Sequence, residues 1–289
     1  MSKIPATTMQ SLLWGSCLIF AANAGIATVS AQTGTTASSP AGPSYADLAD
    51  LASTAPIVAN AQIIDVIPLP ASQAGAPIAG VRRVFVEAKA TGLIRGDNGI
   101  APTVSFLYDA PLDRKGKLPK LKKRQVLMFA RPGSRPGQLQ LTSPGALLDW
   151  TAEREQTVKS VVSELLGGGA APRIIGVGDA FHVAGTVAGE GETQIFLKTE
   201  TGEPVSLSVI RRPGQIPQWA VALGEIVDEA AAAPKPDTFL WYRLACGLPR
   251  DLPPASVRTL SVMDAEAARA DYALVVQAIG ACGRTRPAA

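Results

Sequence analysis

The chain has one histidine, His182, so any acid–base chemistry that needs an imidazole depends on it. Asp179 lies three residues upstream, but a Ser–His–Asp hydrolase also needs a serine on a sharp strand–turn–helix elbow, and no Gly-x-Ser-x-Gly segment occurs. His182 stands between Phe181 and Val183 in an apolar run, which favours a hydrogen-bonded structural histidine. We therefore predict no catalytic residue.

Three cysteines occur, and the first, Cys17, lies in an N-terminal segment that we expect to be removed. Cys246 and Cys282 remain, without the Cys-x-x-Cys spacing of a redox site. An oxidising compartment favours a bond between them, and the alternative is two buried free thiols. We predict the disulfide, which would close a loop of about 36 residues.

Metal and cofactor motifs are equally scarce. One histidine and two oxidised cysteines do not supply a zinc site, and the acidic clusters lack the spacing of a calcium loop. Gly176 and Gly178 lack the third glycine of a dinucleotide-binding loop. We predict neither a metal nor a cofactor. Paired carboxylates for glycoside chemistry stay open, because the fold sets their separation.

The sharpest charged feature is a group of seven cations within eleven residues. Gly116 and Pro119 keep this stretch a loop between two strands. Such a loop suits docking on an anionic surface, and the alternative is a solvated hairpin whose charges discourage edge aggregation. The candidate binding residues are Arg114, Lys115, Lys117, Lys120, Lys122, Lys123 and Arg124.

A second candidate binding group is aromatic. Alternation along an expected strand, residues 238–245, places Trp241 and Arg243 on one sheet face with Tyr242 opposite. Trp219 and two further arginines, Arg211 and Arg212, belong to the same half of the chain. Trp241 and Arg243 are the named candidates for binding a sugar or a peptide. The alternative is that the tryptophans pack in the core.

The N-terminus predicts export. Lys3 precedes an apolar stretch, residues 12–24, and small residues at Val29-Ser30-Ala31 form a cleavage site. We assign residues 1–31 to a signal peptide cleaved near Ala31. The apolar stretch is shorter than the roughly 20 residues of a membrane span, which disfavours the alternative of an uncleaved anchor. No second long apolar run occurs, so we expect no transmembrane segment in the mature chain.

Charge is unevenly distributed between the two halves. Residues 44–145 carry 13 Lys and Arg against 7 Asp and Glu, whereas residues 146–289 carry 13 against 17. The net charge of +3 disfavours nucleic acid as a partner. An anionic envelope component or another envelope protein is the expected partner.

Alternation and turn residues predict an α+β, β-rich fold in two modules. Residues 32–44 are rich in Thr, Ser, Pro and Gly and predict a disordered tether. Residues 45–145 predict a short helix at 45–51, capped by Ser44, followed by five strands. The strands are expected at 57–67, 81–91, 103–108, 125–130 and around Leu139 and Leu141.

Residues 146–289 predict a second module, an antiparallel sheet with one or two covering helices. Helical spacing recurs at 149–166 and at about 263–279, the latter capped by Ser261 or Asp264. Strands are expected at 173–177, 181–187, 194–198, 205–211, 219–227 and 238–245.

The first module resembles small OB-type barrels of the netrin and tissue-inhibitor-of-metalloproteinases class. The resemblance lies in residues 55–63, 84–88 and 124–131, within 45–142, about a third of the chain. It implies an OB-like antiparallel barrel. Those inhibitors begin with a cysteine that reaches the target's metal, and this region has none, so metalloproteinase inhibition does not follow.

Together these features predict an exported, envelope-associated binding protein, periplasmic or extracellular. It would dock an anionic surface or a protein partner through residues 114–124. One alternative is an envelope-polymer hydrolase that uses carboxylates with or without His182. The other is a structural subunit of an envelope assembly, which would expose a large apolar patch.

Overall fold

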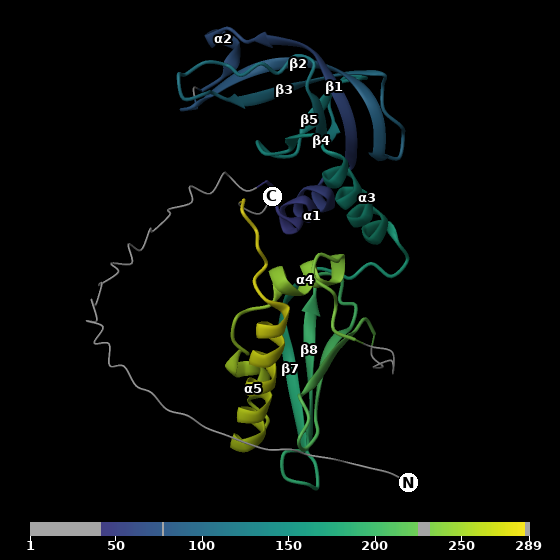
Figure 1. Ribbon diagram of the computed structural model, residues 1–289, viewed down its shortest axis with the longest axis vertical. Helices are drawn as coiled ribbons and strands as arrows, with labels where there is room; N and C mark the ends of the chain where they lie inside the picture. Colours follow the sequence, from purple (N-terminus) through teal and green to yellow (C-terminus); the bar gives the residue numbers. More distant parts are fainter. Residues whose placement is uncertain (1–41, 77, 225–231, 287–289) are drawn as a thin grey trace, which may run out of the picture. The chain divides into compact units, whose positions relative to one another are not determined.

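The computed structural model describes residues 42–76, 78–224 and 232–286 (Figure 1). Residues 41–289 group into one compact unit. The predicted signal peptide, residues 1–31, and most of the predicted tether, residues 32–44, lie outside the described residues. The described residues form an α+β, β-rich fold, as expected, with two antiparallel sheets and five α-helices.

Sheet A has six strands, with the order β3-β2-β1-β4-β5 and β6 paired to β4. All five strands expected in the first module are present, and β6 was not expected. The strands are β1 (Ile57–Pro68), β2 (Val81–Arg95), β3 (Thr103–Pro111), β4 (Gln125–Pro132), β5 (Leu139–Leu141) and β6 (Leu147–Asp149). A short helix, α2 (Ala71–Ala74), precedes β2.

Alternation along the strands of sheet A produces its inner core. Val84, Val86 and Ala88 on β2 are buried against the alternate residues of β1, β3 and β4. Val58 and Leu127 point the other way, into a second hydrophobic cluster, so β1 and β4 are apolar on both faces.

Sheet A is not closed into a barrel by a continuous ladder among the described residues. β3 meets the chain just before β5 at one isolated parallel bridge, between Ser105 and Gln138. The predicted OB-like barrel is therefore not confirmed, and the resemblance that suggested it stays a prediction.

Sheet B is a four-stranded antiparallel sheet in the order β10-β9-β8-β7. Its strands are β7 (Ile174–Ala184), β8 (Gly191–Thr199), β9 (Val205–Arg211) and β10 (Gln218–Ala222). The expected strands at 173–177 and 181–187 are one strand, β7, whose pairing is irregular between Val177 and Ala180. β10 ends at Ala222, and residues 225–227 of the strand expected there lie outside the described residues.

Three predicted helices are confirmed. α1 (Tyr45–Thr54) begins at Ser44, whose side chain and that of Asp47 form a reciprocal capping box. α3 (Ala152–Leu166) is capped by Thr151. α5 (Val262–Ile279) is capped by Ser261 and packs against β7 and β8, as expected of a covering helix. A short 3-10 helix, Pro254–Val257, precedes α5.

The strand expected at 238–245 is wrong: this segment is a helix, α4 (Phe239–Gly247). Thr238 caps it by accepting a hydrogen bond from the Trp241 backbone N–H, and Phe239 and Tyr242 are buried. A short apolar run fits a buried helix as well as a strand, and here the cap and tertiary packing decide.

One hydrophobic cluster draws on both halves of the chain. It contains Leu48 and Leu51 of α1, Val161 of α3, Leu207 of β9 and Tyr272 of α5. The division at residues 145 and 146 stays a prediction, since this cluster lies on both sides of it. No helix within the described ranges has the length and apolar character needed to span a bilayer.

Candidate functional site: the basic loop

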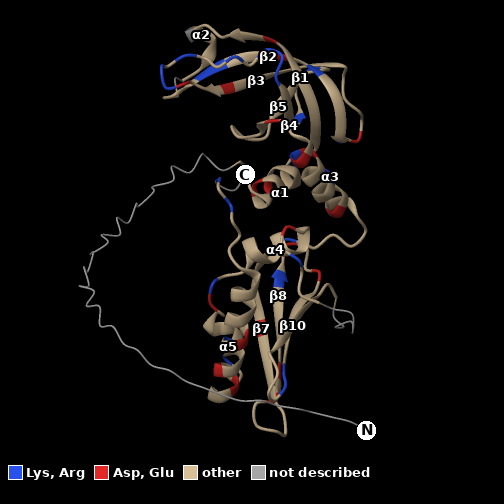
Figure 2. Ribbon diagram, viewed as in Figure 1, with Lys and Arg blue, Asp and Glu red and all other residues tan. Residues whose placement is uncertain are grey.

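The seven predicted cations lie on the segment that joins β3 to β4, residues 112–124, which we call the basic loop (Figure 2). The Asp113 carboxylate accepts hydrogen bonds from the backbone N–H groups of Lys115 and Lys117, each at 2.8 Å. Gly116 adopts a positive φ of 71° in this turn. The loop therefore has a defined hydrogen-bonded tip.

Apolar side chains anchor the other end of the basic loop. Leu121 is buried and Leu118 packs against the inner core of sheet A. The backbone of Ile63 on β1 bonds to Lys123 and Arg124, at 2.9 and 3.0 Å. These contacts hold the loop against the sheet while its charged side chains project outward.

The cations divide into two groups. Lys122 pairs with Asp65 at 3.1 Å, and Arg124 pairs with Asp149. The other five are exposed and form no ion pair with any described residue; we call them the free cations. They are Arg114, Lys115, Lys117, Lys120 and Lys123.

Arg82 extends this charged surface onto the sheet. It lies opposite Ala110 in the β2–β3 pairing, close to the start of the basic loop, and its side chain is exposed. The adjacent Arg83 is instead neutralised by Asp109 at 2.7 Å. Five free cations within ten residues create a local positive potential that attracts anions.

The predicted aromatic group has a different geometry from that expected. Because α4 is a helix, Trp241 and Arg243 do not share a sheet face. The Trp241 indole N–H donates to the Ile279 carbonyl at 2.9 Å, and its ring meets Tyr45 edge-on. These are packing contacts.

Arg243 is likewise engaged inside the fold. Its Nε donates to the Ala171 carbonyl at 3.1 Å, and its guanidinium lies 4.5 Å from the centroid of the Phe239 ring. Burial lowers the pKa of this guanidinium from its ordinary value. A binding role for Trp241 and Arg243 stays a prediction, and both have contacts typical of structural residues.

The predicted disulfide between Cys246 and Cys282 is present, with the two Cα atoms 4.9 Å apart. It links the last turn of α4 to the chain that follows α5, and the C-terminal segment after it is fastened to α1. Arg284 pairs with Asp50 at 2.5 Å, and the Asp50 carboxylate also accepts from the Tyr242 hydroxyl. Burial and this hydrogen bond raise the pKa of Tyr242 to about 12.

Asp47 makes the second attachment of the C-terminal segment. Its carboxylate accepts the backbone N–H groups of Ser44, Thr285 and Arg286 at 2.9 to 3.1 Å, and the Thr285 hydroxyl at 2.5 Å. Burial opposes ionisation of Asp47, but these hydrogen bonds outweigh it and lower the pKa of the carboxyl.

His182 belongs to a hydrogen-bonded chain between sheet B and α5. The Thr193 hydroxyl donates to the fully buried carboxylate of Asp271, which is paired with Arg211. The hydroxyl has one hydrogen, so it accepts from His182 Nδ1, which lies 2.8 Å away. This chain orients the imidazole, with Nδ1 as its donor to Thr193.

Asp271 and the two carboxylates of α1, Asp47 and Asp50, were not predicted from the sequence. A signal for Asp271 existed, because it lies beside Ala268, Tyr272 and Val275 on the apolar stripe of its helix. A carboxylate in such a stripe needs a cation paired with it, and Arg211, which is half-buried, supplies that charge. Asp47 follows Ser44 at capping-box spacing, but its contact with Thr285 and that of Asp50 with Tyr242 join residues more than 190 positions apart, which no local pattern indicates.

In the described part of the chain, no group of three or more His, Cys, Asp or Glu side chains is arranged to hold a metal ion. No protein-family model matches this chain, and no curated protein is significantly similar to it.

Proposed function

We propose that this protein is exported and docks on an anionic phospholipid surface through its basic loop. The observation that carries the proposal is the presence, on a folded loop, of five exposed cations that form no ion pair with a described residue. A loop that only discourages aggregation gains nothing from a fixed shape, whereas a docking surface holds its charges together facing the partner.

Two features support export. The N-terminal pattern of Lys3, the apolar stretch and Val29-Ser30-Ala31 is typical of a secretory signal. The Cys246–Cys282 disulfide is compatible with an oxidising compartment.

Charge and nearby apolar surface favour a lipid partner. Each Lys or Arg close to an anionic bilayer contributes about 1 kcal/mol of attraction. Ile78, with 54% of its surface exposed, lies beside Gly80, whose carbonyl accepts from the Leu112 N–H at the base of the loop. An exposed apolar side chain near the base of a cationic loop suits the headgroup boundary, where both are satisfied.

Co-sedimentation with vesicles tests the proposal. The test variant changes the five free cations to serine: Arg114, Lys115, Lys117, Lys120 and Lys123. The matched control removes five exposed cations that form no ion pair among the described residues: Lys198, Arg212, Arg250, Arg258 and Arg269. The two variants have the same net charge and differ only in where the charges were removed.

The wild-type protein should bind vesicles of phosphatidylglycerol and phosphatidylcholine at low salt, and not vesicles of phosphatidylcholine alone. The loop variant should lose affinity on the order of a thousandfold, because about 1 kcal/mol is lost per cation. The control should bind nearly as wild type does. Equal losses of affinity in both variants would show that vesicle binding depends on net charge alone. That result would contradict docking through the basic loop.

A second candidate function, hydrolysis of an envelope polymer, is favoured by one observation. The Thr193 hydroxyl, held by Asp271, orients the His182 ring through Nδ1, and a general-base histidine needs such an orienting group. The wild-type protein would then cleave peptidoglycan or an acidic glycan. Loss of this cleavage in His182→Gln, at an unchanged thermal midpoint, would establish hydrolysis that depends on His182.

A further inference from the structure

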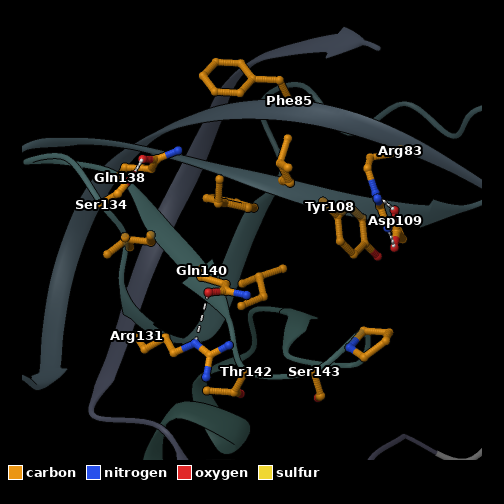
Figure 3. Close-up of a pocket in the computed structure, with 16 residues that line it drawn as sticks. Arg83, Phe85, Tyr108, Asp109, Arg131, Ser134, Gln138, Gln140, Thr142 and Ser143 are labelled. Atoms are coloured by element: carbon orange, nitrogen blue, oxygen red, sulfur yellow. Dashed lines mark hydrogen bonds and ion pairs between the residues drawn. The ribbon is translucent and has the colours of Figure 1, made fainter. Parts of the chain in front are cut away.

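The two outer segments of sheet A are β3 and the chain that leads into β5. They touch at one bridge and then diverge, which leaves a groove. β3 and β5 meet at the Ser105–Gln138 bridge, and beyond it a groove of about 660 Å³ lies between them (Figure 3). This volume falls within the usual range of ligand sites.

The edge of β3 that faces the groove has unused backbone groups. The Leu112 N–H donates to Gly80 beside β2, whereas the Ser105 N–H donates away from β2, to Gly137. Alternation along an antiparallel strand therefore directs the N–H and C=O groups of Leu107 and Asp109 away from β2 as well. No strand in the described ranges lies beside them.

The edge of β5 that faces the groove also has backbone groups that do not bond to the neighbouring strand. The Thr142 N–H donates to Phe129, and the Gln138 carbonyl accepts from Gly133, so the even-numbered residues of this segment bond toward β4. The backbone groups of Leu141 consequently point away from β4 and toward the groove.

Side chains give the groove an apolar floor and a polar rim. Phe106 and Leu139 are buried and line it, and Tyr108 lines it beside the Arg83–Asp109 pair (Figure 3). The Arg83–Asp109 pair stands at one side, and Arg131, which donates to Gln140 at 3.1 Å, stands at the other. Leu107 adds a large apolar side chain that is 50% exposed.

We propose that this groove binds an extended peptide segment of a partner protein, which adds a strand between β3 and β5. The unpaired backbone groups on both sides are the feature that selects a polypeptide, because only a polypeptide offers N–H and C=O groups at the repeat of a β-strand. Alternate peptide side chains would face the floor at Phe106 and Leu139, so that segment carries an apolar residue at every second position.

Selection from a phage-displayed library of random decapeptides tests this site. The target is the purified protein, and Leu107→Pro is the counter-target. Proline removes the N–H on the open edge and leaves the bonds to β2 in place. Leu107→Val is the matched control, because it changes the side chain and keeps the N–H. Enriched peptides should alternate in hydropathy, bind Leu107→Val as they bind wild type, and bind Leu107→Pro at least tenfold more weakly.

Two measurements on the wild-type protein keep the proposal testable if Leu107→Pro fails to fold. N-methylation of a selected peptide, one residue at a time, should weaken binding at consecutive residues of the stretch that lies between β3 and β5, because alternate N–H groups of an inserted strand face β3 and the ones between them face β5. Amide exchange at Leu107, Asp109 and Leu141 should be fast in the free protein and slow in the complex.

Failure to enrich any peptide on the wild type over an irrelevant protein would overturn the proposal. So would uniform tolerance of N-methylation, which indicates recognition through side chains alone. Binding by the five-residue loop variant separates this site from the basic loop, because peptide affinity should persist when vesicle binding is lost.

Discussion

The free cations of the basic loop and three arginines of the C-terminal half, Arg211, Arg243 and Arg284, have opposite surroundings. In the loop, five cations are exposed and form no ion pair within the described part of the chain. In the C-terminal half, Arg211 and Arg284 are paired with the carboxylates of Asp271 and Asp50, and Arg243 lies over an aromatic ring. The same side-chain chemistry therefore stabilises the fold in one region and leaves charge available to a partner in the other.

This difference follows from burial. A carboxylate as buried as Asp271 is costly without a cation, so removing its partner should destabilise the protein. A cation in water costs little and contributes little to folding, so the basic loop should be almost irrelevant to stability. The contrast can be measured by removing cations from each region in turn.

The largest effect is expected at the buried pair. Arg211→Leu leaves the Asp271 carboxylate inside the fold without its counter-charge, and should lower the free energy of unfolding by about 3–5 kcal/mol. Arg212→Leu, at the exposed neighbour, is the control and should change it by less than about 0.5 kcal/mol. Urea denaturation measures both, and similar values for the two variants would contradict the structural role of Arg211.

The disulfide should give the next effect. Cys246→Ser combined with Cys282→Ser frees a loop of 36 residues and should cost about 3–4 kcal/mol. The bonds from the C-terminal segment to Asp47 should loosen as well, because the disulfide fixes where that segment starts. Denaturation and hydrogen exchange at Thr285 and Arg286 report the two effects separately. Unchanged exchange at both amides would show that α1 holds the segment without the disulfide.

Asp47 gives a smaller, pH-dependent effect. Its folded-state pKa is lowered from the ordinary value of 3.8, so its contribution is fully present above that value. The contribution is lost as the pH falls through the lower, folded-state pKa. Asp47→Asn should cost about 1–2 kcal/mol at pH 7 and flatten the acid limb of the stability curve below about pH 4. Denaturation between about pH 2 and pH 7, a range that brackets the ordinary carboxyl pKa of about 4, records this curve. An unaltered acid limb would contradict a stabilising role for the ionised Asp47 carboxylate.

The smallest effect on stability should come from the loop. Changing the five free cations to serine should move the free energy of unfolding by less than about 0.5 kcal/mol. Thermal and urea unfolding check this directly. A loss of several kcal/mol would place the loop with Arg211 and Arg284 among the structural cations.

Local signals in the sequence were sufficient for much of the fold. Alternation and apolar runs located five of the six strands described in sheet A, helical spacing located α3 and α5, and Ser44 and Ser261 marked helix starts. The segment at 238–245 was misassigned because a short run of Leu, Trp and Tyr carries no decisive period, and its helix depends on Thr238 and on packing.

Of the two candidate sites, the basic loop could be predicted from the sequence and the groove could not. The basic loop is a contiguous run and was visible in the sequence, but the pairing of Lys122 with Asp65 required the fold. The groove was not visible, because its two sides come from segments about 30 residues apart and depend on the register of β3 and β5.

The most direct test of the central claim is to find which surface touches the lipid. Lys117→Trp places a fluorophore on the basic loop, and Arg258→Trp places one at an exposed position in the C-terminal half. On vesicles of anionic brominated lipid, Lys117→Trp should be quenched well beyond the native tryptophans, and Arg258→Trp should match the wild-type background. Equal quenching of the two, or none in either on bound protein, would contradict docking through the loop.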